Sequence, residues 1–420
     1  MHDAMQTVKG TVVKSLVFRV ESFPPQLEWL LGEFRLMVNR SIRIALSHDI
    51  RSRYRLSAAA YRQLSAEHSI YKQYIPSAFE VAMCALKAYR RRLRKGKRSS
   101  TPYMMRPMLK AENQSYRLDR ETGRLRIPVR RGEMAVILQL TMSDWHRSIL
   151  NDPSWRLGSL TVVPGKVIIA VRKDPPERYE PEAAIALDTN EDSLDGVFAK
   201  GEGARLTSIP FGGVRQVQAT HFRRRRILAR KKANDRRVQR MLLDREGKRE
   251  RNRVRQRLHV VSKDLVKAAK ENQAAIVLEN LTLHGSGGRS RQMNRRLSSW
   301  PRSEIHRQIE YKSALEGVPI IKINPRYTSK TCPVCGALRR DRVGRVFKCG
   351  CGWSMDRQHN ASLNILNTAL ASNEALARAV RFQPGALRDD AVIPLYDLQA
   401  VPEGARDESS GDEVDFVEAT

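Results

Sequence analysis

Four of the five cysteines in this 420-residue chain lie within twenty positions of one another. Cys332 and Cys335 form one pair, and Cys349 and Cys351 form a second pair after thirteen intervening residues. Thiolates are soft ligands that bind zinc tetrahedrally, and two pairs joined by a short basic segment can reach one ion. A redox role is the alternative, but paired motifs at both ends of the segment fit a zinc knuckle better. The spacing predicts one structural Zn²⁺ held by these four cysteines.

Three acidic residues stand at the ends of predicted elements. Asp188 and Glu279 each close a short apolar run typical of a buried strand, and Asp356 opens a predicted helix. Such carboxylates can meet at one edge of a sheet and hold two divalent ions about 3.5–4 Å apart for phosphodiester hydrolysis. Mg²⁺ suits oxygen ligands of this kind. The alternative is that each acid caps a helix or lies in a turn. Three acids in this order, in so basic a chain, favour a catalytic magnesium site.

The charge of the chain indicates its partner. Lys and Arg number 76 against 45 Asp and Glu, which gives a formal net charge of +31. The simplest partner for such a surface is a nucleic-acid backbone, whose counterions are released when Lys and Arg replace them. No apolar run approaches the roughly 20 residues that span a bilayer, and the N-terminus lacks a signal-peptide pattern. We therefore expect a reduced, cytoplasmic, nucleic-acid-binding protein with no membrane contact, in which the remaining cysteine, Cys84, is buried in a helix.

Basic residues are concentrated in two segments. Between Arg223 and Leu258 there are seventeen basic residues against four acids, and a second cluster covers residues 89–98. A charge run is commonly a solvated helix face, but such a face normally mixes signs. An excess of this size repels itself unless a polyanion neutralises it, which favours contact with a nucleic-acid duplex. The candidate nucleic-acid-binding residues are Arg90, Arg91, Arg92, Arg94, Arg223, Arg224, Arg225, Arg226, Arg230 and Arg326.

The N-terminal half must be built from both strands and helices. Residues 8–20 alternate and are rich in Val, which predicts a strand. Apolar residues recur at spacings of three and four over residues 26–98, which predicts helices. Residues 101–175 contain short strand-like runs, and residues 174–181 have the composition of a linker. The pattern therefore places a helical insert between strands.

The C-terminal half must position the acids and the cysteines. The predicted strands cover residues 183–188, 274–279 and 318–324, and the predicted helices cover residues 216–272, 300–316 and 360–381. From Glu403 onward the chain has seven acids, one Arg and no apolar periodicity, so we expect this tail to be disordered. The whole is an α/β plus β multidomain chain.

Several segments closely resemble the RuvC-like nuclease of TnpB proteins and of the miniature type V CRISPR effectors related to them. The segments that carry the resemblance are residues 187–192 (Leu-Asp-Thr-Asn-Glu-Asp), 262–272, 276–281, 294–300 (Asn-Arg-Arg-Leu-Ser-Ser-Trp), 324–336 and 356–361. The match covers about residues 183–370 and is highly specific, whereas the N-terminal half matches only in plan. Asn190 stands where the family usually has Gly, and Gln358 where it often has a second acid; neither change removes a core ligand.

The resemblance implies an RNase H-like fold with a split active site. Asp188, Glu279 and Asp356 take the family's catalytic, magnesium-binding positions, and the four clustered cysteines take its zinc positions. The N-terminal part would be a β-barrel wedge domain with a helical recognition insert. Family members bind a guide RNA, recognise a short motif beside the target and cut double-stranded DNA with one active site. The chain would then be a prokaryotic protein, nucleoid-associated when bound to DNA.

The same resemblance implies a domain plan. Its parts are the first wedge strand (1–24), the helical recognition insert (25–100), the rest of the wedge and the linker (101–180), the RuvC-like nuclease with basic helices (181–325), the zinc-binding target-nucleic-acid module (326–354), the last nuclease motif (355–385) and an acidic tail (386–420).

Three functions are compatible with these features. The favoured one is an RNA-guided DNA endonuclease, because all three acids are present. The second is an RNA-guided DNA-binding protein with weak or no cleavage, which would be expected to have lost one acid. The third, a DNA transposase, also uses three acids on an RNase H-like fold, but the cysteine module inside the nuclease and the guide-binding plan argue against it. The oligomeric state stays open.

Overall fold

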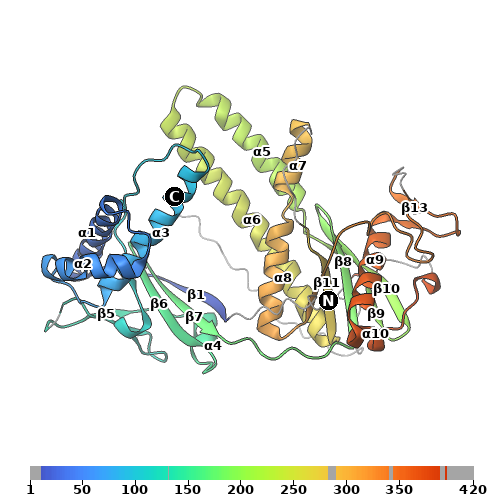
Figure 1. Cartoon of the computed structure of the whole chain (residues 1–420), viewed down its shortest axis with the longest axis horizontal. Helices are drawn as coiled ribbons and strands as arrows, with labels where there is room; N and C mark the ends of the chain where they lie inside the picture. Colours follow the sequence, from blue (N-terminus) through green and yellow to red (C-terminus); the bar gives the residue numbers. More distant parts are fainter. Residues whose placement is uncertain (1–10, 131, 282–289, 340–343, 388–392, 395–420) are drawn as a thin grey trace. The chain divides into compact units, whose positions relative to one another are not determined.

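The computed structural model describes residues 11–130, 132–281, 290–339, 344–387 and 393–394. The chain divides into two compact units, Gly10–Asp174 and a second that contains Pro175–Thr420 (Figure 1). The division falls inside the segment predicted to be a linker, residues 174–181. The acidic tail predicted from Glu403 onward lies outside the described residues. Within the described parts of the chain, none of the helices is both long and apolar enough to cross a membrane.

The described part of the Gly10–Asp174 unit combines four α-helices with two antiparallel sheets. A four-stranded sheet has the order β1-β7-β6-β2, and a three-stranded sheet the order β3-β4-β5. The strands are β1 Val12–Arg19, β2 Leu109–Ala111, β3 Arg117–Leu118, β4 Arg124–Ile127, β5 Val136–Gln139, β6 Arg156–Val163 and β7 Lys166–Lys173. The helices are α1 Pro25–Ser47, α2 Arg53–Glu67, α3 Tyr74–Arg94 and α4 Asp144–Leu150, with a 3₁₀ turn at Asn113–Ser115.

The predicted alternation in this unit is confirmed. In β1, Leu16 and Phe18 are buried while Val13 and Val17 are exposed, so one face of the strand packs on the core and the other faces outward. The predicted helical insert is α1 to α3, grouped beside the β1-β7-β6 sheet (Figure 1). The prediction for Cys84 is wrong: it lies on α3, but on the exposed side. The apolar residues beside Cys84 in the sequence suggested burial, although this position lies on the exposed face of the helix.

The second unit is organised around a six-stranded mixed sheet with the order β12-β11-β8-β9-β10-β15. Strands β8, β11 and β12 are parallel, and β9 runs antiparallel to both β8 and β10. The strands are β8 Ala183–Thr189, β9 Ser193–Lys200, β10 Gly203–Pro210, β11 Ala274–Glu279, β12 Ile320–Ile323 and β15 Ile393–Pro394, with a separate hairpin of β13 Val346–Lys348 and β14 Ser354–Asp356.

Helices cover both faces of this sheet. They are α5 Val214–Lys231, α6 Arg236–Glu271, α7 Arg291–Ser299, α8 Arg302–Glu316, α9 Arg357–Ser372 and α10 Glu374–Ala379, with a 3₁₀ turn at Pro384–Ala386. Alternate residues of β8 enter two cores: Ile185 packs with Leu258 and Ile305 of α6 and α8, and Ala186 packs with Leu363 of α9. Because both faces are buried, β8 and β11 are almost wholly apolar until their final residues.

Strands β9 and β10 were not predicted. Asp195 and Gly196 interrupt the apolar pattern of β9, and both residue types are depleted in strands. The glycine has a packing reason: a Cβ at Gly196 would lie 2.4 Å from the carbonyl oxygen of Ala186 on β8. Such a contact is too short, so β9 can approach β8 this closely only without a side chain at position 196.

Candidate acid site and cysteine cluster

Asp188 and Glu279 end two neighbouring parallel strands. Leu187 of β8 pairs with Leu278 of β11 in the sheet register, so the acid that follows each leucine lies at the same edge. Asp188 is half-buried, and Glu279 is only 6% exposed. The strand register therefore puts Asp188 and Glu279 at one edge of the sheet, and their role as a shared site stays a prediction.

The electrostatics of this edge favour a bound cation. Burial, the largest cause, and the nearby charges of Glu279 and Asp195 together raise the pKa of Asp188 to about 7. Burial also raises the pKa of Glu279, although the Thr328 hydroxyl donates a hydrogen bond of 2.5 Å to its Oε1 and opposes that shift. Two neighbouring carboxyls that are both partly removed from water resist simultaneous ionisation, and a cation between them relieves that repulsion.

A fourth carboxylate that sequence reasoning missed lies opposite Asp188. Asp195 of β9 pairs with Asp188 in the β8–β9 register and is 5% exposed. Its side chain accepts hydrogen bonds from Asn190 Nδ2 at 2.7 Å, from Ser193 Oγ at 2.6 Å and from Ser208 Oγ. Three donors hold this carboxylate in one orientation beside the predicted site. The available signal was an acid inside a strand-like run, which is rare unless its charge is satisfied.

Asp356 closes β14 and caps α9. Its Oδ1 accepts the backbone N–H of Gln358 at 2.8 Å, so the capping role considered from the sequence is present. Its Oδ2 accepts Nε–H of the largely exposed Arg345 at 2.7 Å. Among the described residues, the four clustered cysteines are the only group of three or more His, Cys, Asp or Glu side chains gathered at metal-ligand spacing. The structure thus joins Asp188 to Glu279 but leaves Asp356 paired with an arginine.

The four cysteines are gathered at the spacing that a tetrahedral metal requires. Cys332 Sγ lies 3.7 Å from Cys351 Sγ, and Cys335 Sγ lies 3.6 Å from Cys349 Sγ. All four sulfurs lie within 4.8 Å of one another. Zn–S bonds of about 2.3 Å in a tetrahedron place the sulfurs about 3.8 Å apart. The four side chains could therefore hold one metal ion.

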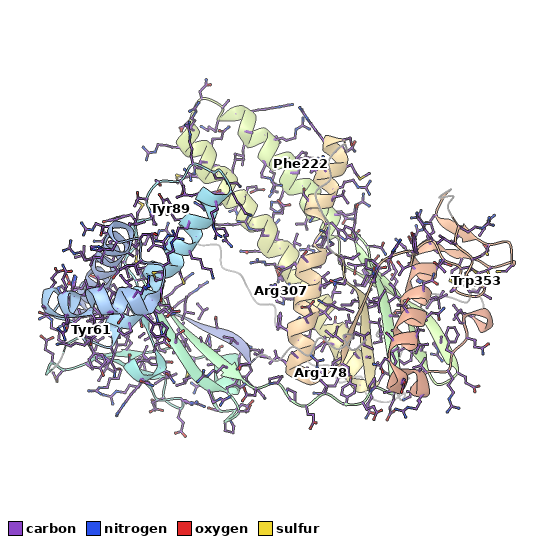
Figure 2. All side chains as sticks on the ribbon, in the orientation of Figure 1. Tyr61, Tyr89, Arg178, Phe222, Arg307 and Trp353 are labelled. Carbon is purple, nitrogen blue, oxygen red and sulfur yellow. The ribbon has the colours of Figure 1, made fainter. Side chains whose placement is uncertain are left out.

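Hydrogen bonds fasten the cysteine cluster to α9. Asn360, which is fully buried, accepts from the Trp353 indole at 3.1 Å and donates to the Thr331 carbonyl at 3.0 Å (Trp353 is labelled in Figure 2). One turn later, Asn364 Nδ2 donates to the carbonyls of Thr328 and Thr331, each at 2.8 Å. These bonds hold the segment that precedes Cys332, and Thr328 in that segment contacts Glu279. The cluster and the acid site are therefore mechanically connected.

The thiols differ in their ease of ionisation. A hydrogen bond from the Cys351 backbone N–H, the largest cause, lowers the pKa of Cys349 to about 7, although desolvation opposes it. Burial is the main cause that raises the pKa of Cys332. Because thiolates are the form that binds metal, an ion at this cluster displaces protons as it binds.

Of the ten candidate nucleic-acid-binding arginines, eight present exposed side chains: Arg91, Arg92, Arg94, Arg223, Arg224, Arg226, Arg230 and Arg326. The other two, Arg90 and Arg225, are half-buried and engaged within the fold. Arg90 donates to the Ile50 carbonyl at 3.1 Å and pairs with Asp49 at 3.3 Å. Arg225 of α5 pairs with Glu250 of α6. The basic pattern along the sequence could not separate these two structural cations from the exposed ones.

Comparison with known proteins gives matches in both halves of the chain. The family described as Cas12f1-like, TNB domain, matches residues 303–365, and the family described as Uncharacterized protein MJ0013 matches residues 30–128. TnpB-like protein MJ0751 of Methanocaldococcus jannaschii is 26% identical over 239 residues, which are 55% of this chain and 85% of the relative. The CRISPR-associated endodeoxyribonuclease Cas12f1 of Sulfoacidibacillus thermotolerans is 36% identical over 101 residues, 23% of each chain.

Solved structures show the same fold. Cas12f1 in its complex with sgRNA and target DNA has a TM-score of 0.55 at 16% identity, covering 82% of this chain and 83% of that chain. The mini-RNA-guided endonuclease CRISPR-Cas_phi3 has a TM-score of 0.50 at 12% identity, with 87% and 93% covered. The protein thus has the mixed α/β, multidomain fold of these effectors. The sequence and structural matches together show that the chain is similar to TnpB-like proteins and to miniature CRISPR-associated endonucleases of the Cas12f1 type.

Proposed function

We propose that this protein is an RNA-guided DNA endonuclease that hydrolyses phosphodiester bonds at one RuvC-like site. The observation that carries the proposal is the placement of Asp188 and Glu279 at the ends of adjacent parallel strands, where their burial favours a bound cation. The six-stranded sheet with helices on both faces supports an RNase H-like fold for this unit. The two antiparallel sheets of the Gly10–Asp174 unit, with α1 to α3 between β1 and β2 along the chain, support a wedge domain with a recognition insert.

Asp188, Glu279 and Asp356 would hold Mg²⁺. The donor set is all carboxylate oxygen, which suits this ion. Bound Mg²⁺ would activate the attacking water and stabilise the leaving oxygen of the phosphodiester. Asp356 contributes only after it exchanges Arg345 for the metal, since that arginine occupies its Oδ2. Thr328 orients Glu279 through its hydroxyl, and the donors to Asp195 fix the negative charge opposite Asp188.

The cysteine cluster would hold a structural Zn²⁺. The sulfur spacing fits that ion, and its four protein ligands leave no open coordination position for chemistry. Its bonds through Asn360 and Asn364 to the segment containing Thr328 support a role in positioning the acid site.

The proposed partners are a guide RNA and target double-stranded DNA. The exposed arginines of α3 and α5 supply charge for backbone contacts, while base pairing with the guide would supply sequence specificity. The domain boundaries expected from the sequence, with the wedge at 1–24 and 101–180 and the target module at 326–354, belong to the same proposal.

One observation favours a second candidate, an RNA-guided DNA-binding protein with weak cleavage. Asp356 is bound to Arg345, and the acids are not gathered at metal-ligand spacing within the described residues. If that ion pair persists in the complex, target binding would proceed while hydrolysis stayed slow. No observation favours a transposase.

The deciding experiment supplies the purified protein with guide RNA, Mg²⁺ and a plasmid target, and then changes the guide sequence. Cutting that follows the guide supports the endonuclease. A target that is bound but uncut supports the second candidate. Cutting that ignores the guide contradicts both RNA-guided functions.

A further inference from the structure

A cavity of about 260 Å³ lies between α5 and α7. On α5 its wall is a stripe with the spacing of one helix face, formed by Arg215, Gln218, Ala219 and Phe222. Helices that face one another normally pack through apolar stripes of this spacing. Here Arg215 and Gln218 make half of the stripe polar, and α7 has no buried residue among its nine. The two helices therefore enclose a space instead of a core.

Polar contacts hold the far wall of the cavity in place. Arg296 of α7 pairs with Glu191 at 2.9 Å, and the Arg295 guanidinium lies 4.0 Å from the centre of the Phe222 ring. Phe222, labelled in Figure 2, lies on the side of α5 that faces α7. Gln218 Nε2 donates to the Ser299 carbonyl at 2.6 Å. The cavity is thus built before any ligand arrives.

The wall is also cationic. Four arginines line the cavity against two glutamates, Glu191 and Glu250. Glu191 is shared by Arg296 and Arg215, and Glu250 is taken by Arg225. Arg295 pairs with no carboxylate in the part of the chain that the structure describes; its contact is the Phe222 ring. An aromatic floor with surplus guanidinium charge suits a ligand that has both a flat ring and an anionic group.

The cavity adjoins the loop after β8. The indole of Trp300, which also lines the cavity, donates to the Asn190 carbonyl at 2.7 Å, and Glu191 follows in the same loop. That loop begins directly after Asp188 and Thr189. A polymeric ligand with one of its units bound in the cavity would therefore pass beside the edge of the sheet that carries Asp188.

We propose that this cavity binds a single unpaired nucleotide of a nucleic-acid strand, with its base at the Phe222 and Trp300 side and its phosphate at Arg215 and Arg295. A cavity of about 260 Å³ is large enough for one base. Stacking on an aromatic ring tolerates every base, so the site is independent of sequence. The inference deepens the proposed nuclease function, on which it rests for its biological setting.

The test uses the full-length protein without guide RNA, target or Mg²⁺. The probe is a five-nucleotide single strand carrying one 5-iodouracil, cross-linked by light and mapped to peptides by mass spectrometry. The variants are Ala219→Glu and Thr220→Glu. Both positions are exposed on α5 and both changes add one negative charge, but only position 219 lines the cavity. Thermal unfolding of both variants checks that the fold is retained.

We expect cross-links on the peptides containing Phe222 and Trp300, with a yield that falls about tenfold in Ala219→Glu and less than about twofold in Thr220→Glu. Equal losses in the two variants, or cross-links confined to other basic segments, would overturn the inference. Unlabelled competitors separate the sources of the anion: the same oligonucleotide must compete, and inorganic phosphate at equal concentration must not. If thymidine monophosphate competes as well as the oligonucleotide, the site takes a free nucleotide and the strand proposal is wrong.

This experiment is independent of cleavage. If guide-directed cutting is absent but the cross-link pattern is as expected, the proposed nuclease function fails and the cavity assignment stands. If cutting is present and Ala219→Glu behaves like Thr220→Glu, the nuclease function stands and the cavity assignment fails.

Discussion

The cysteine cluster and the acid site are both proposed metal sites, but their ligands come from very different lengths of chain. The four sulfurs come from twenty consecutive residues and already stand at the spacing of a bound metal. The carboxylates come from positions 188, 279 and 356, and one of them is still paired with Arg345. Local turns alone can assemble the first site. The second depends on strand register and on the packing of α9, so it can be left incomplete until a ligand arrives.

The largest effect is expected at the acids themselves. Asp188→Ala and Glu279→Ala should each lower guide-directed cleavage at least about 10³-fold, because each removes a charge meant for the metal and the developing phosphate charge. Target binding, measured by gel shift with guide RNA, should stay within about twofold because neither residue lies in the basic segments.

The matched control for the acids is Glu202→Gln, at an exposed position in the turn between β9 and β10. It should leave cleavage unchanged. If Asp188→Ala or Glu279→Ala kept near wild-type cleavage, that residue would be removed from the site.

The next largest effect is expected at the cluster. Wild-type protein should contain about one zinc per chain by elemental mass spectrometry. Cys332→Ser should lower that content and the thermal unfolding midpoint together, because binding energy at a structural metal is folding energy. Cys84→Ser, at an exposed site on α3, should change neither. If the protein without zinc kept its full stability, the cysteine cluster would not be a structural metal site.

Asp195→Asn tests the carboxylate that the sequence did not predict. An amide cannot accept all three hydrogen bonds, so the charge and its orientation opposite Asp188 are both lost. Cleavage should fall about 10–100-fold, the usual cost of removing a group that orients a metal ligand. Zinc content should be unchanged, and a parallel loss of zinc would show general unfolding instead.

The smallest effect is expected in how the stability of the fold near the acid site depends on pH. Burial lowers the pKa of His306 to about 4, and its Nε2 lies 2.8 Å from Oγ1 of Thr189, next to Asp188. In the unfolded chain this histidine titrates near 6.5. Between those values the unfolded state binds a proton that the folded state refuses, so stability is lost as the pH falls from about 6.5 to 4, by up to about 3 kcal/mol.

His306→Gln should remove that contribution, so the difference in unfolding midpoint between variant and wild type should change across this pH range. His48→Gln, at an exposed position just after α1, is the control and should run parallel to wild type. Identical pH profiles for His306→Gln and wild type would show that the buried imidazole does not carry the effect.

The sequence predicted the features that depend on local patterns and missed those that depend on contacts between distant parts of the chain. The cysteine spacing and the apolar strands before Asp188 and Glu279 are local patterns, and the sulfur cluster and the pairing of β8 with β11 agree with them. Asp195 was missed because it lies opposite Asp188 only once β9 pairs with β8, and Gly196 interrupts the sequence pattern that would have predicted β9.

Asn190 shows the same limit at one residue. As a sequence letter it departs from the glycine usual in the resembling family. In the fold its side chain holds Asp195, and its carbonyl accepts the indole of Trp300, 110 positions away. Contacts at that separation are set by tertiary packing, which no local pattern encodes.

Gly196 also defines a point of mutational intolerance. Any methyl group placed there meets the Ala186 carbonyl oxygen at 2.4 Å, and the backbone must move to accept it. The displaced segment carries Asp195, which pairs with Asp188 across β8 and β9. Even the smallest side chain at position 196 would therefore push the two strands apart and separate these two acids. In a saturation library, this glycine should therefore tolerate no replacement, although it contacts neither metal nor nucleic acid in the proposed mechanism.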